Sequence, residues 1–497
     1  MMPCAEGIGL RQSTDRFSQM ALRTPQQYID SLKDGRTVYY RGEKVADVTT
    51  HKTISKAVKH ACVDYEMAEE PEYRDLCVVE EGGDVYSRYF KLPANTDDLL
   101  KRSALIEATT GRGKTLVPLV KEIGTDALFA MHRVSRNMDR KYEGEFFKRV
   151  EAFYRHCRDN DLTMSVAQTD VKGDRGQGPS GQTDPDYYTR IVERRSDGIV
   201  VRGAKIHTSC TTNVNELIVI PTRAMAEADA DYAVAFAIPV DTPGLKLVAS
   251  PYGGAPKNEF DAPLSADRKM METITIFDDV FVPWERVFMA GEYDFCGPLA
   301  LGFVEYHRFT AISYKLPLVD ALIGSALLMA DMNGITKAAH VREKIVWLIS
   351  YAETLRALIE MSALRGKADE YGVFAPDALT VNMAKYHFAH KYHEALQHVQ
   401  DIAGGMLVTG PGVEDFANPA TGDLLRKYLG GRAGVGGEER TRAMNMVSDL
   451  TTGDFGGYHA VLAIHAEGSL EAEKLMISRA YDGRRALAYA KTIAGLA

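Results

Sequence analysis

The sequence predicts a multi-domain α+β protein in which an N-terminal helical domain, a middle antiparallel β domain and a C-terminal helical bundle follow one another. The expected domains are residues 1–160, 161–290 and 291–497. Apolar residues recur with a helical period from Thr24 to about 160, with a period of two from 162 to about 287, and with a helical period again from about 291. The 497 residues are 45% hydrophobic and 26% charged, which is the composition of a globular chain with material for a large core. We therefore expect three domains with these boundaries.

The N-terminal domain opens with a helix that Thr24 caps and Pro25 begins. Pro118 lies in an otherwise helical run and is expected to break or kink it. The other helices of this domain are expected over residues 54–69, 71–78, 97–110, 124–139 and 143–160.

The middle domain is predicted from strand-like runs on both sides of Ser196, Asp197 and Gly198, a sequence that favours a hairpin turn. The C-terminal domain has the longest helical segments, and long antiparallel helices favour a bundle. Its helices are expected over residues 303–332, 336–371, 378–403, 416–429, 438–451 and 483–494.

The charge and the apolar pattern indicate a cytoplasmic protein that binds neither nucleic acid nor a membrane. The net charge is −9 without a block of Lys and Arg, which argues against nucleic acid as a partner. The N-terminus lacks the features of a signal peptide, and Asp320 and Asp331 interrupt the longest apolar stretch, 316–332. The six cysteines are scattered without a C-x-x-C spacing, so neither a disulfide scaffold nor a metal cluster is predicted.

A polar, glycine-rich segment over residues 169–185 reads T-D-V-K-G-D-R-G-Q-G-P-S-G-Q-T-D-P. Its glycines let the backbone approach a polar ligand closely, and its polar side chains supply donors. The strand-like run 198–210 follows and ends in small hydroxylic residues. No G-x-G-x-x-G follows a strand and opens a helix, which argues against a Rossmann nucleotide site. The two segments are therefore expected to form two walls of a cofactor site.

Five motifs give the chain a resemblance to a known family. They are T-D-V-K-G-D-R-G from Thr169, D-G-I-V-V-R-G-A-K from Asp197, F-D-D-V-F-V-P-W-E-R-V-F from Phe277, Y-H-R from Tyr306 and D-I-A-G-G-M-L-V-T from Asp401. In this order they resemble the 4-hydroxyphenylacetate 3-hydroxylase superfamily, and within it most closely the 4-hydroxybutyryl-CoA dehydratase branch. The resemblance implies an acyl-CoA dehydrogenase-like fold and FAD as cofactor.

The resemblance also implies which residues face the flavin. A neighbouring subunit commonly supplies the paired glycines of the D-I-A-G-G motif, so a homodimer or homotetramer is expected. The implied cofactor-binding residues are Gln168, Thr169, Asp170, Asp174, Arg175, Gly176, Gln177, His207, Thr208, Ser209, Lys315, Gly404 and Gly405.

The resemblance to the dehydratases fails at the residues that hold their iron–sulfur cluster. Three cysteines and a histidine hold that cluster beside the flavin. His307 matches the histidine, but Pro118, Glu122 and Tyr314 stand at the positions of the cysteines. Because a cluster normally needs four soft ligands, we expect no metal here and no radical dehydration.

Other members of the superfamily take reduced FAD from a separate reductase, form a flavin hydroperoxide with oxygen, and transfer one oxygen atom to a phenol. The resemblance therefore favours an FAD-dependent, two-component monooxygenase that hydroxylates a phenolic or related aromatic substrate, with a flavin reductase as partner. The candidate residues are His307, Tyr314 and Glu272 for catalysis and Arg112, Lys114 and Glu122 for binding the substrate.

Two other functions stay open. A cluster-free lyase or isomerase of the 4-hydroxybutyryl-CoA dehydratase type, acting on a CoA thioester, would explain why Glu272 and His307 are retained. A non-enzymatic flavoprotein is the third reading. Structural roles also stay open for single residues: Lys315 as a solvated cation, Glu272 as an edge-strand carboxylate, and the pair Gly404 and Gly405 as a helix end.

Overall fold

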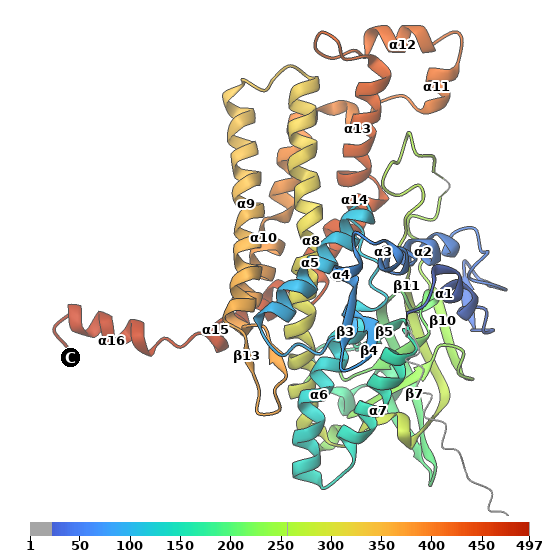
Figure 1. Cartoon of the computed structure of the whole chain (residues 1–497), viewed down its shortest axis with the longest axis vertical. Helices are drawn as coiled ribbons and strands as arrows, with labels where there is room; N and C mark the ends of the chain where they lie inside the picture. Colours follow the sequence, from blue (N-terminus) through green and yellow to red (C-terminus); the bar gives the residue numbers. More distant parts are fainter. Residues whose placement is uncertain (1–21, 256, 497) are drawn as a thin grey trace, which may run out of the picture.

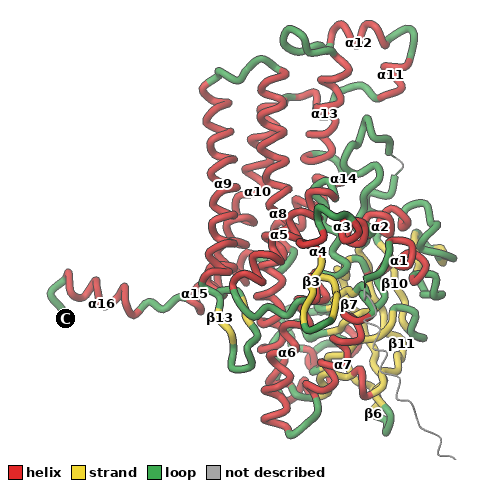
Figure 2. Tube along the Cα trace, in the orientation of Figure 1, coloured by secondary structure: helices red, strands yellow, loops and turns green. Residues whose placement is uncertain are grey.

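The computed structural model describes residues 22–255 and 257–496. The expectation that the N-terminus is not a signal peptide concerns residues 1–21, which lie outside the described residues. Figure 1 shows three long helices, α8, α9 and α10, side by side, with the β-sheets and the N-terminal helices packed along one flank of this bundle. The C-terminal helix α16 projects away from the rest of the chain (Figures 1 and 2).

The N-terminal region begins as the sequence predicts, because Thr24 and Gln27 form a reciprocal capping box around Pro25. Pro118 lies between two helices, as expected. The predicted helix over 71–78 is shorter, because the chain enters the hairpin β3 (Val78–Glu81) and β4 (Asp84–Ser87) instead. The helices of this region are α1 (Pro25–Ser31), α2 (Ile54–Ala61), α3 (Val63–Glu69), α4 (Arg74–Cys77), α5 (Thr96–Arg112), α6 (Glu122–Tyr142) and α7 (Phe146–Asp159).

Two sheets form the β region. The six-stranded sheet has the order β2-β1-β10-β11-β7-β6, and the four-stranded sheet has the order β12-β9-β8-β5. Their strands are β1 (Val38–Tyr40), β2 (Glu43–Lys44), β5 (Met164–Ala167), β6 (Arg190–Arg194), β7 (Gly198–Ser209), β8 (Glu216–Val219), β9 (Val234–Pro239), β10 (Leu245–Ala249), β11 (Glu272–Pro283) and β12 (Val287–Ala290).

The pairing of these strands agrees with the predicted hairpin and departs from a purely antiparallel arrangement. Strands β6 and β7 pair antiparallel on either side of the predicted turn. Strand β1, from the region predicted to be helical, pairs parallel with β10, and β5 pairs parallel with β8. These pairs join segments far apart in the chain, so local periodicity gives no sign of their direction.

The C-terminal region is a helical bundle with two short strands, β13 (Lys367–Ala368) and β14 (Phe374–Ala375). The predicted helix over 336–371 ends earlier, because this hairpin follows it. Helices α14 and α15 were not predicted. The helices are α8 (Cys296–Met332), α9 (Ala339–Leu364), α10 (Ala378–Ala403), α11 (Val413–Ala417), α12 (Gly422–Tyr428), α13 (Gly437–Thr451), α14 (Asp454–His465), α15 (Leu470–Ala480) and α16 (Arg484–Ile493).

Helix α8 is the central helix of the bundle. Its apolar residues lie on several faces, and most of its residues are buried. Within the described residues, the segment Tyr293–Met332 is the one long and apolar enough to cross a membrane by composition. It packs against α5, α6, α9 and α10, and 56% of its most apolar window is buried, as in the core helix of a globular fold.

Candidate functional site

A cavity of about 730 Å³ opens between the six-stranded sheet and α14. Its apolar wall includes Ile206, Val248, Ile274 and Phe455, and its polar wall includes His207, Glu272 and Tyr458. Three cations, Lys257, Arg268 and Lys269, stand along the segment before β11. This size and this mixture of apolar walls with a few polar groups are typical of a small-molecule site. We call it the main cavity.

Glu272 is the centre of the polar wall of the main cavity. The Tyr458 hydroxyl donates to its Oε1 over 2.6 Å, and the Ser209 hydroxyl lies 2.9 Å from Oε1 and 3.0 Å from Oε2. Burial raises the pKa of Glu272, while Tyr458, Ser209 and Lys269 lower it in part. A carboxyl group whose pKa is raised is a better proton acceptor than a free glutamate. The predicted catalytic residue Glu272 therefore lies in a cavity and has the chemistry of a base.

A second polar cluster is centred on Glu467, which lies between α14 and α15. Tyr314 of α8 donates to its Oε1, and Lys315 donates to its Oε2 over 2.7 Å. Lys385 of α10 stands 3.6 Å from the same oxygen. Burial raises the pKa of Glu467, but the two lysines outweigh burial and bring it to about 2. Lys315 is therefore a buried, paired cation and not a solvated one.

His307 takes part in a third buried cluster. Its Nδ1 lies 3.1 Å from Oδ2 of Asp126 on α6, and its ring stacks on Phe303 with the centroids 5.1 Å apart. Oδ1 of Asp126 accepts from Arg102 over 2.7 Å and from Thr310 over 2.8 Å. The carboxylate thereby fixes the histidine ring, as in other sites where a carboxylate orients a base. The described residues give Nε2 no hydrogen-bond partner, so it is the nitrogen left for chemistry.

Glu122 lies one helical turn before Asp126 and is completely buried. Its Oε2 accepts from the Lys121 backbone over 3.0 Å, whereas its Oε1 has no partner within the described residues. Burial raises its pKa. Because buried polar atoms in proteins are nearly always hydrogen-bonded, Oε1 of Glu122 is a candidate for contact with a ligand or a water. The charge of Glu122 also acts on the Cys210 thiol, as does that of Glu272, so the two carboxyl groups share one neighbourhood.

The predicted flavin wall is divided between the cavity and the interior. His207 lines the main cavity, with a left-handed φ of 58°, and Ser209 bonds Glu272. Thr208 points to the interior and bonds Thr275 over 2.6 Å. Asp170 is buried, and Lys205 pairs with its carboxylate over 2.9 Å.

The loop over residues 169–185 is held by hydrogen bonds between its own residues. The carboxylate of Asp174 accepts from the backbone of Gly176 over 2.8 Å, and the backbone of Asp174 donates to Gln182 over 2.9 Å. Gln168 and Thr169 are partly buried at the end of β5, and Arg175, Gly176 and Gln177 are exposed. The N–H groups of Gly176 and Gln177 are used within the loop, where both donate to Asp174.

Arg112, Lys114, Gly404 and Gly405 lie outside the polar clusters described above and do not line the main cavity. Arg112 is exposed and pairs with Glu70. Lys114 donates to the Pro263 carbonyl over 3.1 Å. Gly404 and Gly405 are exposed at the end of α10, where Gly404 has a φ of 89° and ends the helix. Their predicted contact with the flavin of a neighbouring subunit stays a prediction.

Sequence reasoning missed three residues that hold these clusters, namely Tyr458, Glu467 and Asp126. Each contacts a predicted site residue that is more than 150 positions away in the chain. One signal was present for Asp126, because Glu122 was a candidate and the next helical turn faces the same way.

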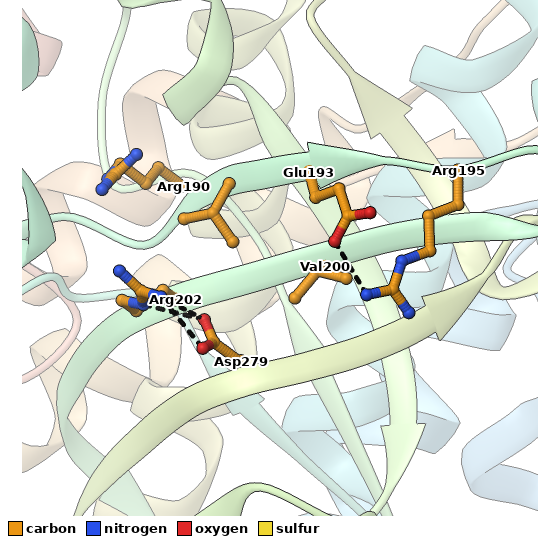
Figure 3. Close-up of a pocket in the computed structure, with 7 residues that line it drawn as sticks. Arg190, Glu193, Arg195, Val200, Arg202 and Asp279 are labelled. Atoms are coloured by element: carbon orange, nitrogen blue, oxygen red, sulfur yellow. Dashed lines mark hydrogen bonds and ion pairs between the residues drawn. The ribbon is translucent and has the colours of Figure 1, made fainter.

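The residues that the structure describes contain no group of three His, Cys, Asp or Glu side chains arranged to hold a metal ion. A second hollow of about 430 Å³ lies on the outer face of β6, β7 and β11 (Figure 3). Its cations are paired: Arg195 with Glu193 over 2.7 Å and Arg202 with Asp279 over 2.7 Å. None of the predicted site residues lines this hollow, so the main cavity is the better candidate.

Comparison with known proteins gives matches over nearly the whole chain. The model for the N-terminal part of 4-hydroxyphenylacetate 3-hydroxylase matches residues 24–289, and the model for its C-terminal part matches residues 296–495. The chain is 35% identical over 493 residues to 4-hydroxybutyryl-CoA dehydratase/vinylacetyl-CoA-Delta-isomerase of Clostridium aminobutyricum, covering 96% of this chain and 100% of that one. It is 32% identical over 437 residues to the 4-hydroxyphenylacetate 3-monooxygenase oxygenase component of Thermus thermophilus, covering 87% and 89% of the two chains.

A solved structure shares the fold. The oxygenase component of 4-hydroxyphenylacetate 3-monooxygenase, complexed with FAD, superposes with a TM-score of 0.88 at 29% identity, covering 95% of this chain and 98% of that one. The predicted fold class, an acyl-CoA dehydrogenase-like α+β protein, is thereby confirmed.

Proposed function

This chain belongs to the 4-hydroxyphenylacetate 3-hydroxylase family, and on that premise we propose that it is a flavin-dependent monooxygenase. Its substrate is a phenolic or related aromatic compound, and a separate reductase supplies reduced FAD. The observation that carries the proposal is the set of residues at the cluster positions. Glu122 and Tyr314 have oxygen atoms there, Pro118 has no donor side chain, and Tyr314 is engaged with Glu467. Such a set suits an aromatic oxygenation, which needs no iron–sulfur cluster.

The main cavity fits a flavin by size and by donor chemistry. Its volume of about 730 Å³ lies in the range of cofactor sites, and its apolar wall suits a flat ring system. Nε of Arg268 is buried without a partner among the described residues, and burial and Lys257 lower the pKa of Lys269 to about 8. Both cations would be stabilised by an anionic group such as the diphosphate of FAD.

His207 and Ser209 would hold the flavin from the sheet, and Lys269 and Arg268 would hold its anionic part. When bound, reduced flavin supplies the electrons that activate dioxygen for transfer of one oxygen atom to the ring. The protein has to bind the aromatic substrate, exclude water and take up the proton of the phenol. Glu272 is the base that the main cavity offers for that proton.

The proposal is tested with isotopically labelled dioxygen. Purified protein, reduced FAD and a panel of phenols that includes 4-hydroxyphenylacetate are mixed, and the products are analysed by mass spectrometry. We expect one labelled oxygen atom in the hydroxylated product of at least one phenol. Oxidation of the flavin without any hydroxylated phenol across the panel would contradict the proposal.

A second candidate is a cluster-free lyase or isomerase that acts on a CoA thioester. The retained Glu272 and His307 favour it, together with the 35% identity to the dehydratase. Turnover of 4-hydroxybutyryl-CoA by the flavin-loaded protein without oxygen would establish it. Iron analysis of the purified protein is the control, because an intact cluster would restore the dehydratase mechanism.

A further inference from the structure

Tyr458 contacts the carboxylate of Glu272 at the wall of the main cavity. It lies on the second turn of α14, and both side chains line the cavity. The Tyr458 hydroxyl donates to Oε1 of Glu272 over 2.6 Å and lies 3.2 Å from Sδ of Met270. Ser209 donates to the same carboxylate. The carboxylate is thus held between two hydroxyl groups, and Tyr458 belongs to the helix that closes the cavity.

The surroundings decide which member of the pair carries the proton. Burial and the charge of Glu272 raise the pKa of Tyr458 well above its usual value, so the tyrosine stays protonated at neutral pH. Burial also raises the pKa of Glu272, which makes the carboxylate a better proton acceptor. The other titratable groups that act on the pair are Lys269 before β11, Cys210 after β7 and Tyr314 of α8.

We propose that Tyr458 is a further catalytic residue, which relays the proton of a phenolic substrate to Glu272. The phenol O–H bond breaks as an O–H bond forms at the Tyr458 oxygen, and the original hydroxyl proton of Tyr458 passes to Oε1 of Glu272. The step produces a phenolate and a neutral Glu272, and no electrons are transferred. A phenolate ring is richer in electrons than a phenol ring, which favours oxygen transfer to carbon. This relay rests on the proposed monooxygenase function.

The relay predicts a spectroscopic signature that a merely structural tyrosine would not give. The probe is 4-nitrophenol, which turns yellow when it loses its proton. Bound to the flavin-loaded wild-type protein, it is expected to ionise at a lower pH than in free solution. In Y458F and in E272Q this shift is expected to be lost, while flavin binding is retained. Tyr481→Phe is the matched control, because Tyr481 is 58% exposed outside the cavity.

The rate of phenol hydroxylation gives the second measurement. Both variants are expected to lower it by about 10²-fold or more, the range found for general acid–base catalysis. In the wild type the rate falls towards low pH, because a protonated Glu272 cannot accept the relayed proton. E272Q is expected to lose this acid limb. The double variant should be no slower than the slower single variant, because the two residues act in one step.

The outcomes separate the relay from the function on which it rests. If wild type hydroxylates a phenol and Y458F does so with the same rate and pH profile, the relay is wrong and the monooxygenase stands. If wild type neither binds 4-nitrophenol nor hydroxylates any phenol, the proposed function is wrong and the relay with it. A variant that no longer binds flavin is replaced by Glu272→Asp, which keeps the acceptor and should restore the ionisation shift in part.

Discussion

At the scale of single residues, the site is built from carboxylates whose surroundings set them to different tasks. Glu467 faces two lysines and stays ionised, whereas Glu272 faces two hydroxyl groups and can take up a proton. Asp126 is fixed by Arg102 and orients His307. Pairs of titratable groups whose environments move their pKa values apart are typical of acid–base sites.

Replacement of Glu467 by Gln is expected to destabilise the fold by about 3–5 kcal/mol. It leaves Lys315 and Lys385 buried without their shared counter-ion. The measurement is urea unfolding at neutral pH. Glu471→Gln is the control, because Glu471 is 82% exposed and its variant should unfold like wild type. A Glu467 variant as stable as wild type would contradict this account of the cluster.

The same residue predicts how stability depends on pH. The pKa of Glu467 is about 2 in the folded protein, against 4.5 for a free glutamate. Because the pKa of Glu467 is lower in the folded than in the unfolded protein, its ionised carboxylate stabilises the fold at pH values above the unfolded pKa. This stabilisation is lost as the pH falls from about 4.5 to 2. The loss amounts to about 3 kcal/mol at 1.36 kcal/mol per pKa unit. Unfolding by urea at several pH values should show this loss in wild type and a smaller one in the Gln variant.

Lys269→Met is expected to weaken FAD binding about tenfold or more, because the main cavity loses a cation that would face the anionic part of the flavin in the proposed binding mode. Titration of the protein with FAD at two salt concentrations measures this. The wild-type affinity should fall with salt, and the affinity of the variant should fall less. Lys246→Met is the control, since Lys246 pairs with Asp278 on the exposed sheet surface. Equal affinities in both proteins would place the flavin elsewhere.

At the scale of elements, α14 is the helix that closes the main cavity and carries Tyr458. Its first turn packs closely on the end of α13. A Cβ added at Gly456 would lie 2.7 Å from the carbonyl oxygen of Leu450 and 2.7 Å from backbone atoms of Thr451. Backbone atoms cannot give way as a flexible side chain can, so the position of this helix depends on the glycine.

Gly456→Ala is therefore expected to shift α14, separate Tyr458 from Glu272 and lower both stability and phenol turnover. Thermal unfolding and the hydroxylation rate measure the two effects. Gly436→Ala is the control, because nothing lies within 4 Å of a Cβ there and the residue has an ordinary φ. An unchanged rate in the Gly456 variant would show that the placement of α14 does not govern the reaction.

The elements also show what local sequence can predict. Thr24 with Pro25, Pro118 and the turn at Ser196 act through neighbours within a few residues, so their effects were predicted correctly. The parallel pairing of β1 with β10 joins segments about 200 residues apart, and no local pattern carries that information. Helix α14 was missed although it closes the main cavity.

At the scale of the whole molecule, the periodicity of the apolar residues predicted the order of helical, β and helical regions, and five motifs identified the family. Candidate residues within those motifs, such as Glu272 and His307, lie in buried polar clusters. Their partners Tyr458 and Asp126 lie outside the motifs, because a site assembled by the fold draws on segments that no motif contains. The substrate depends on the same assembly and cannot be named from separate segments.

The predicted homodimer or homotetramer depends on the exposed end of α10. Gly404 and Gly405 are exposed where α10 ends. We expect sedimentation to show a dimer or tetramer and Gly405→Trp to weaken flavin binding in that assembly. A flavin-binding monomer would contradict the shared site.

The most direct test of the central claim is the fate of dioxygen. The protein is mixed with reduced FAD, a phenol and isotopically labelled dioxygen, and the mass of the product is measured by mass spectrometry. The account predicts a phenol that gains one labelled oxygen atom, and much less of it in Y458F and E272Q. Turnover of a CoA thioester without oxygen, and no labelled phenol from any member of the panel, would contradict it.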